Sequence, residues 1–150
     1  MSIEYRHEIT VEDYNALRRA VGWDPIEPSQ AKEGLRNSAY IICAADGDKI
    51  VGHARAVSDG GYVVLISDVI VLPDYQKNGI AKTMVQELMD FFTSRLKSGQ
   101  AILFNLMAAK GRESFYKQFG FAERPNDEVG AGMSQWFRAV SYTHLTLPTN

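Results

Sequence analysis

The residues best suited to chemistry lie at Gln76–Lys82, where a long apolar segment gives way to an amphipathic one. Gly79 falls at the expected start of a helix, and the first turn of a helix leaves about four backbone N–H groups without partners. Those groups and the positive end of the helix dipole attract anions such as phosphate. Glycine lets the anion approach the backbone, and Lys77 and Lys82 add positive charge. The segment therefore predicts a phosphate-binding turn, although the same pattern also begins helices that bind nothing.

Two common nucleotide-binding motifs fail at this turn. A Walker-type loop, GxxxxGK[ST], that ends on Lys82-Thr83 needs glycine where the chain has Gln76 and Ala81. The dinucleotide pattern GxGxxG does not occur in the sequence. The turn is therefore not expected to be a Walker-type or a Rossmann-type nucleotide site.

Asp68 and His53 are candidates for acid–base chemistry. Asp68 lies inside an apolar segment, where a carboxylate needs either a partner or a function, so it is a candidate base or cation-binding group. The alternative is an internal ion pair with an arginine such as Arg55. His53 is a candidate to line a cleft, but a satisfied structural histidine is the commoner role. Cysteine, histidine and carboxylate residues show no metal-ligand spacing, so no metal is expected.

The composition limits the class of protein. With 150 residues, 45% of them hydrophobic, the chain is expected to fold as one globular domain. The net charge of −2 gives no general attraction for nucleic acid or an anionic membrane, and no apolar run approaches the roughly 18–20 residues of a membrane span. The single Cys43 and the lack of a signal peptide favour a cytoplasmic location.

The hydrophobic pattern predicts the elements that must position these residues. A helix follows the N-cap Thr10, and a long amphipathic helix runs from Ile80 until Gly99 closes it. An antiparallel meander feeding a β-α-β crossover predicts a mixed α/β fold. The domain is expected over residues 1–140, with Ser141–Asn150 as a tail that resembles read-through sequence. The expected strands are Ile3–Glu8, Ala39–Ala45, Lys49–Val57, Tyr62–Leu72, Ala101–Met107 and Trp136–Val140, and the shorter helices are Pro28–Arg36 and Gly111–Gln118.

Two motifs resemble those of the GNAT superfamily of N-acetyltransferases. The string Val71-x-Pro73-x-Tyr75-Gln76-x-x-Gly79-x-Ala81 is similar to its acyl-CoA motif, Arg/Gln-x-x-Gly-x-Gly/Ala. The string Glu113-x-Phe115-Tyr116-x-x-Phe119-Gly120-Phe121 is similar to its second signature, a helix with a tyrosine followed by a Gly-Phe strand entry. The resemblance covers about residues 3–140. Ala81 replaces the commoner second glycine, and Ala109 stands where many members have asparagine.

The resemblance implies a central, mostly antiparallel sheet of about six to seven strands flanked by about four helices. It also implies an N-acetyltransferase that moves acetyl directly from acetyl-CoA to a primary amine of a small molecule. Tyr116 would protonate the leaving thiolate, since a phenol of pKa about 10 matches an alkyl thiolate. Asp68 is the candidate base on the residue argument given above, with the ion pair as its alternative. A core aromatic is the other role open to Tyr116. The cofactor residues would be Val69, Ile70 and Val71 for the pantetheine arm, and Gln76, Lys77, Asn78, Gly79, Ile80, Ala81 and Lys82 for the pyrophosphate.

Two other functions are compatible with the same sequence. A non-catalytic acyl-CoA sensor would keep the turn at Gln76–Lys82 without a working acid or acceptor site. An unrelated α/β binding domain would use Gly79 only to begin a helix. The identity of the acceptor is not encoded in any motif, and a homodimer formed through exposed strands is compatible with the sequence.

Overall fold

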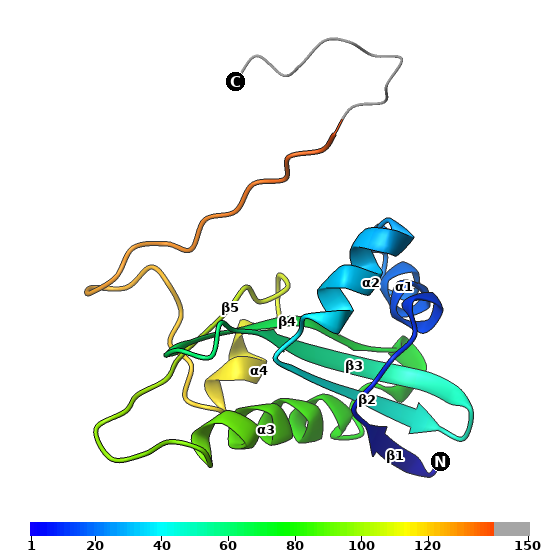
Figure 1. Ribbon diagram of the computed structural model, residues 1–150, viewed down its shortest axis with the longest axis horizontal. Coiled ribbons are helices and arrows are strands. Elements are labelled where there is room, and N and C mark those ends of the chain that lie inside the picture. The colour runs from blue at the N-terminus through cyan, green and yellow to red at the C-terminus, as the bar shows by residue number, and fades with distance from the viewer. Residues whose placement is uncertain (140–150) are drawn as a thin grey trace. The chain divides into compact units, whose positions relative to one another are not determined.

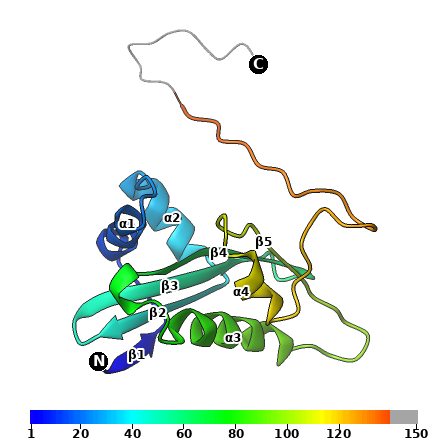
Figure 2. The same ribbon diagram turned by 180° about the vertical axis from the view of Figure 1, so that it is seen from behind.

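The computed structural model describes residues 1–139, which are shown in two views in Figures 1 and 2. By its internal contacts the chain divides into a first unit, Met1–Ala109, and a second unit that begins at Lys110. The predicted tail, Ser141–Asn150, lies outside the described residues, and the single domain over residues 1–140 stays a prediction. Within the described part of the chain, no helix is long and apolar enough to cross a membrane.

The first unit contains one five-stranded sheet in the order β1-β2-β3-β4-β5. The first four strands are antiparallel neighbours, whereas β5 runs parallel to β4 because a helix connects them. This is the predicted meander followed by a crossover, and the mixed α/β class is confirmed. The strands are β1 (Ile3–Arg6), β2 (Tyr40–Asp46), β3 (Lys49–Val57), β4 (Val63–Val71) and β5 (Leu103–Leu106).

Helices cover both faces of this sheet (Figures 1 and 2). On one face, α1 (Val11–Ala20) and α2 (Pro28–Arg36) pack together, and the Tyr14 ring of α1 meets His53 of β3. On the other face lies α3 (Ile80–Thr93), since a Cβ on Gly52 would lie 3.2 Å from the Met84 side chain. Neighbouring residues of a strand point to opposite faces, so β3 contacts both layers. A short 3₁₀ helix, η1 (Pro73–Tyr75), precedes α3.

The local signals for the helix starts are confirmed. Thr10 is extended and its Oγ1 accepts a hydrogen bond from the Asp13 N–H at 3.1 Å, which caps α1 as predicted. Pro28 occupies the first turn of α2, where its missing N–H costs nothing. In the second unit, α4 (Glu113–Lys117) is the short helix expected within Gly111–Gln118.

The strand count is lower than predicted: within residues 1–139 five strands are present instead of six to seven. Residues 122–139 form no strand, so the described part of the predicted Trp136–Val140 strand, residues 136–139, is absent. The Trp136 and Phe137 side chains are 70% and 73% exposed. An isolated strand is not stable without a hydrogen-bonded neighbour, and an alternating pattern carries no information about whether that neighbour exists.

Candidate functional site

The predicted phosphate turn, Gln76–Lys82, connects η1 to α3. Both Lys77 and Gly79 have left-handed backbones, with φ of 67° and 76°. Gly79 is the N-cap of α3, no side chain caps the helix there, and the first helical bond runs from the Thr83 N–H to the Gly79 carbonyl at 3.0 Å. The N–H groups of the three residues between them therefore lie at the open end of the helix, as an anion site requires.

The turn is open on its outer side and braced on its inner side. A Cβ added to Gly79 would meet no atom within 4 Å, and the Lys77 and Lys82 side chains are exposed. The Asn78 amide donates to the Tyr75 and Gln76 carbonyls at 3.2 and 3.1 Å. The residues present therefore fit a pyrophosphate, because backbone donors and two cations surround open space. Ile80 is buried in the first turn of α3, and Ala81 is half-buried beside it.

The C-terminal half of β4 has one open edge. β5 pairs only with Val63–Ile66, so from Ser67 onward β4 is paired with β3 alone. The Leu72 N–H donates to the Val51 carbonyl of β3 at 2.9 Å. Because neighbouring residues of an antiparallel strand point their peptide groups in opposite directions, those of Val71 and Val69 face the open edge. An extended ligand can add to such an edge through backbone hydrogen bonds.

A β-bulge lies at the start of this open edge. His53 pairs with Ile70 and Arg55 with Ser67, so Asp68 and Val69 together oppose the single residue between His53 and Arg55. Asp68 has φ of 56°, a left-handed conformation that costs an L residue roughly 1–2 kcal/mol. Glycine is the usual residue at such a bulge, so surrounding contacts must hold Asp68 in this conformation.

Those contacts enclose the Asp68 carboxylate. Arg18 Nη1 of α1 donates to Oδ1 at 3.1 Å, and Arg55 Nε of β3 donates to Oδ2 at 2.7 Å. The Tyr14 hydroxyl of α1 also donates to Oδ2, at 2.8 Å. Burial alone would raise the pKa of this carboxyl group, but the bonds from Arg55 and Tyr14 and the Arg55 charge outweigh burial and lower the pKa. The ion pair with Arg55, the alternative to a base, is present, and the predicted catalytic role of Asp68 stays a prediction.

His53 lies beneath this cluster and does not line a cleft, because it is fully buried. Its Nδ1 lies 3.2 Å from the Asp68 carbonyl oxygen; since that oxygen can only accept, Nδ1 carries the proton. Nε2 is buried without a hydrogen-bond partner among residues 1–139. Burial lowers the pKa of His53 to about 4, against the bond to Asp68, so the ring is neutral at pH 7.

Comparison with known proteins places these features in a family. A sequence profile of the Acetyltransferase (GNAT) family matches residues 5–121. The chain belongs to the GNAT family. An uncharacterized N-acetyltransferase of Pyropia yezoensis is 32% identical over 126 residues, which are 81% of this chain and 70% of that protein.

Two solved structures of similar proteins share the fold. A probable acetyltransferase of methicillin-resistant Staphylococcus aureus aligns with a TM-score of 0.80 at 27% identity, over 91% of this chain and 100% of its own. A GNAT-family acetyltransferase of Streptococcus pneumoniae aligns with a TM-score of 0.73 at 30% identity, over 92% of this chain and 98% of its own. The GNAT-like architecture predicted from the two motifs is therefore confirmed.

Tyr116, the predicted acid of this GNAT protein, lies in α4 of the second unit. Its ring makes edge-to-face contacts with Phe115 and Phe121, with centroids 5.0 and 6.1 Å apart. Burial raises the pKa of the hydroxyl, so the phenol is protonated at neutral pH. The aromatic setting fits a core residue, the protonated state fits an acid, and the catalytic role stays a prediction.

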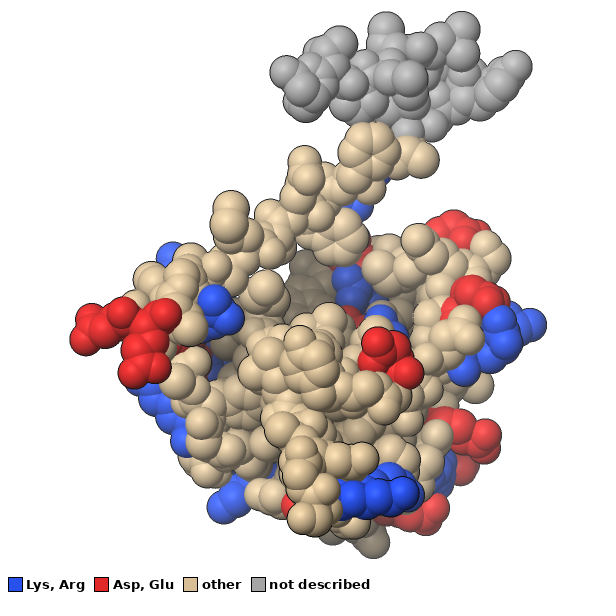
Figure 3. All heavy atoms as spheres, turned by 60° about the vertical axis from the view of Figure 1, so that its left-hand side comes forward, with Lys and Arg blue, Asp and Glu red and all other residues tan. Residues whose placement is uncertain are grey.

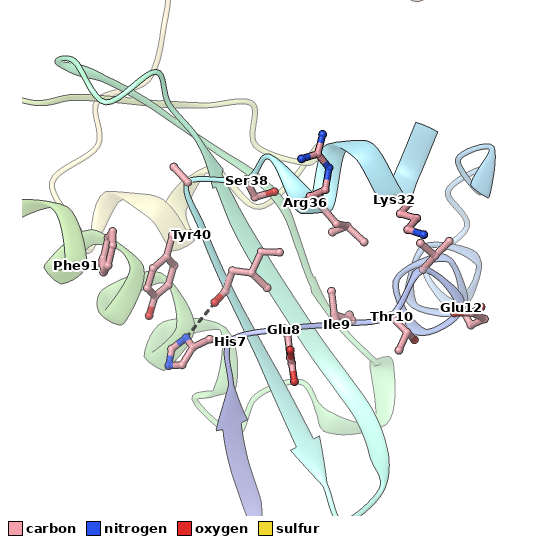
Figure 4. Close-up of a pocket in the computed structure, with 14 residues that line it drawn as sticks. His7, Glu8, Ile9, Thr10, Glu12, Lys32, Arg36, Ser38, Tyr40 and Phe91 are labelled. Carbon is pink, nitrogen blue, oxygen red and sulfur yellow. Dashed lines mark hydrogen bonds between the residues drawn. The ribbon is translucent and has the colours of Figure 1, made fainter. Parts of the chain in front are cut away.

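The GNAT chain also has a cleft of about 960 Å³ that the sequence did not indicate (Figure 4). The segment between β1 and α1, helix α2, the start of β2 and Phe91 of α3 form its walls. Tyr40 lies against Phe91 with ring centroids 4.6 Å apart, and His7 Nδ1 bonds the Ile41 carbonyl oxygen at 3.0 Å. Phe91 is 11 residues past Ile80, so the cleft lies roughly 16 Å along α3 from the phosphate turn. Residues of four separate segments line the cleft, and no motif in the sequence predicts it.

Proposed function

We propose that this GNAT chain is an N-acetyltransferase that moves the acetyl group of acetyl-CoA directly to a primary amine of a small molecule. The observation that carries the proposal is that the open edge of β4 leads, through the short η1, to the phosphate turn. The Gln76 side chain at the start of the turn donates to the Val71 carbonyl at the end of β4, at 3.0 Å. One extended ligand with a pyrophosphate at one end, as in acetyl-CoA, would use both features at once.

In the proposed reaction the amine nitrogen attacks the thioester carbonyl carbon. The new C–N bond forms as the C–S bond breaks, the amine loses one proton, and the leaving thiolate gains one. The Val69 N–H on the open edge is the proposed donor to the carbonyl oxygen as it gains negative charge. Tyr116 is the proposed acid, on the strength of the family motif and its protonated phenol. Asp68 is a weak base because its pKa is lowered, which favours a positioning role over proton abstraction.

A small acceptor and a cytoplasmic location belong to the same proposal. The face shown in Figure 3 carries acidic and basic side chains interspersed, with no broad basic patch on that face to bind a polyanion. Cys43 is buried and unpaired, in keeping with a reducing compartment. Among residues 1–139, no group of three or more metal-binding side chains gathers at one place.

A thermal-shift experiment tests donor binding. Acetyl-CoA at about 100 times its dissociation constant adds roughly 2.7 kcal/mol to the stability of a protein that binds it, so we expect the melting temperature to rise by several degrees. Gly79→Asp is expected to abolish this rise, because its carboxylate would occupy the space open to the pyrophosphate.

Gly99→Asp is the matched control for this experiment. Gly99 also has a left-handed backbone, with φ of 84°, and open space around its missing Cβ. This variant therefore suffers the same backbone strain away from the turn, and we expect it to keep the full ligand-induced rise. If the melting temperature of the wild-type protein does not rise at millimolar acetyl-CoA, the proposal is wrong.

The alternative function is a non-catalytic acyl-CoA sensor on the same fold. Both functions predict acetyl-CoA binding, but only an enzyme releases CoA when an amine is supplied, which a thiol reagent detects across a panel of small amines. Tyr116→Phe removes the proposed acid and is expected to lower turnover by roughly 10²–10⁴-fold without reducing the thermal shift. Equal turnover in both proteins rules out Tyr116 as the acid, and binding without CoA release for every amine favours the sensor.

A further inference from the structure

The β4 bulge decides which peptide groups of β4 face the open edge. In the structure the Leu72 N–H donates to the Val51 carbonyl of β3. In the register that β3 and β4 keep before the bulge, Ser67 pairs with Arg55. If β4 continued in that register without the extra residue, Val71 would lie opposite Val51 of β3. The peptide groups of Val71 and Val69 would then face β3, because a shift by one residue exchanges the two directions. The extra residue at Asp68 therefore turns the Val69 N–H outward.

The bulge is anchored to its surroundings through both the side chain and the backbone of Asp68. Three donors from α1 and β3 meet its carboxylate, whose side chain is only 10% exposed. The His53 Nδ1–H meets its carbonyl oxygen at 3.2 Å. An aspartate does not by itself favour the left-handed conformation over a regular strand conformation. The bulged conformation is therefore selected by these bonds.

We propose that Asp68, with Tyr14, Arg18 and Arg55, forms a positioning cluster that sets the β4 bulge and thereby aims the Val69 N–H at the acetyl carbonyl oxygen of acetyl-CoA. This inference rests on the proposed function. Asp68 is a positioning residue in this scheme: it acts through the peptide backbone and takes no proton from the amine. The cluster joins α1 to β3 and β4, so the helix takes part in shaping the open edge.

Carbon-13 NMR of bound acetyl-CoA labelled at the acetyl carbonyl tests this arrangement. A hydrogen bond polarises a carbonyl group, so the bound resonance in wild-type protein is expected to lie downfield of the free ligand. Asp68→Ala removes the cluster and should move the resonance of the bound ligand back toward the free position, with the labelled ligand supplied at a concentration that saturates each variant. Asp68→Asn keeps one acceptor oxygen, which can still receive the bonds from Arg55 and Tyr14, and asparagine tolerates a left-handed backbone, so most of the downfield displacement should persist.

The outcomes separate this inference from the proposed function. Wild-type protein that does not bind the labelled ligand contradicts the acetyltransferase proposal itself. Binding with a downfield resonance that persists in Asp68→Ala overturns the positioning cluster and leaves the proposed function standing. If Asp68→Ala does not fold, Tyr14→Phe removes only one hydroxyl from the cluster and is expected to move the resonance part of the way back; an unchanged resonance in that variant also overturns the inference.

Discussion

Asp68→Ala is expected to lower the free energy of unfolding by about 3–5 kcal/mol. The change would leave the Arg18 and Arg55 side chains, 9% and 18% exposed, charged and without their shared counter-charge. Keeping the left-handed conformation at this position would also cost alanine roughly 1–2 kcal/mol without compensating bonds. Domains of this size have a total stability of about 5–15 kcal/mol, so the loss is a large share of it. Urea unfolding followed by circular dichroism measures the change.

Two matched variants show whether the loss comes from the cluster. Asp68→Asn keeps the volume and acceptor oxygen of the side chain, so we expect a smaller loss of about 1–3 kcal/mol. Asp127→Ala changes an exposed aspartate of the second unit and should stay within about 0.5 kcal/mol of wild type. If Asp68→Ala lost no more than Asp127→Ala, the buried ion pairs would contribute nothing measurable to the fold.

The elements that the sequence predicted well are those with local signals. The cap at Thr10 and the proline at the start of the predicted Pro28–Arg36 helix each act within a few residues. The final strand failed because its existence depends on a partner strand, which no local pattern specifies. Similarly, α3 ends at Thr93, before the predicted Gly99: Leu96 continues the apolar stripe, but in the structure it does not belong to the helix.

The candidate site divides in the same way. The phosphate turn was predicted because all its residues are consecutive, and a helix start needs only local geometry. The surroundings of Asp68 were predicted only in part. Arg55 was named as an example of an internal arginine and lies on the neighbouring strand. Tyr14 and Arg18 were not named, and they lie 54 and 50 residues away from Asp68 in the chain. The bulge itself has no sequence signal, since the position that usually carries glycine carries Asp68.

Between pH 6.5 and about 4, the protein is expected to lose about 3 kcal/mol of stability through His53. Burial depresses the folded-state pKa of this histidine to about 4, whereas the unfolded chain takes up a proton near pH 6.5. The folded state therefore binds fewer protons within this window. Full stability is present above pH 6.5 and is lost as the pH falls toward the folded pKa. The lowered pKa of Asp68 acts at still lower pH, because carboxylates of the unfolded chain protonate near pH 4.

Urea unfolding at intervals from pH 7 to pH 4 measures this slope, and His53→Asn isolates its source. The asparagine amide retains a donor for the Asp68 carbonyl but does not titrate. Over this pH window the stability of His53→Asn should therefore fall less than that of wild type, by nearly the full 3 kcal/mol. The same slope in His53→Asn and wild type would show that His53 takes up its proton equally readily in the folded chain. In that case the imidazole beneath the bulge would be accessible to solvent protons. The assignment of His53 as a neutral, buried donor to the Asp68 carbonyl at pH 7 would then be wrong.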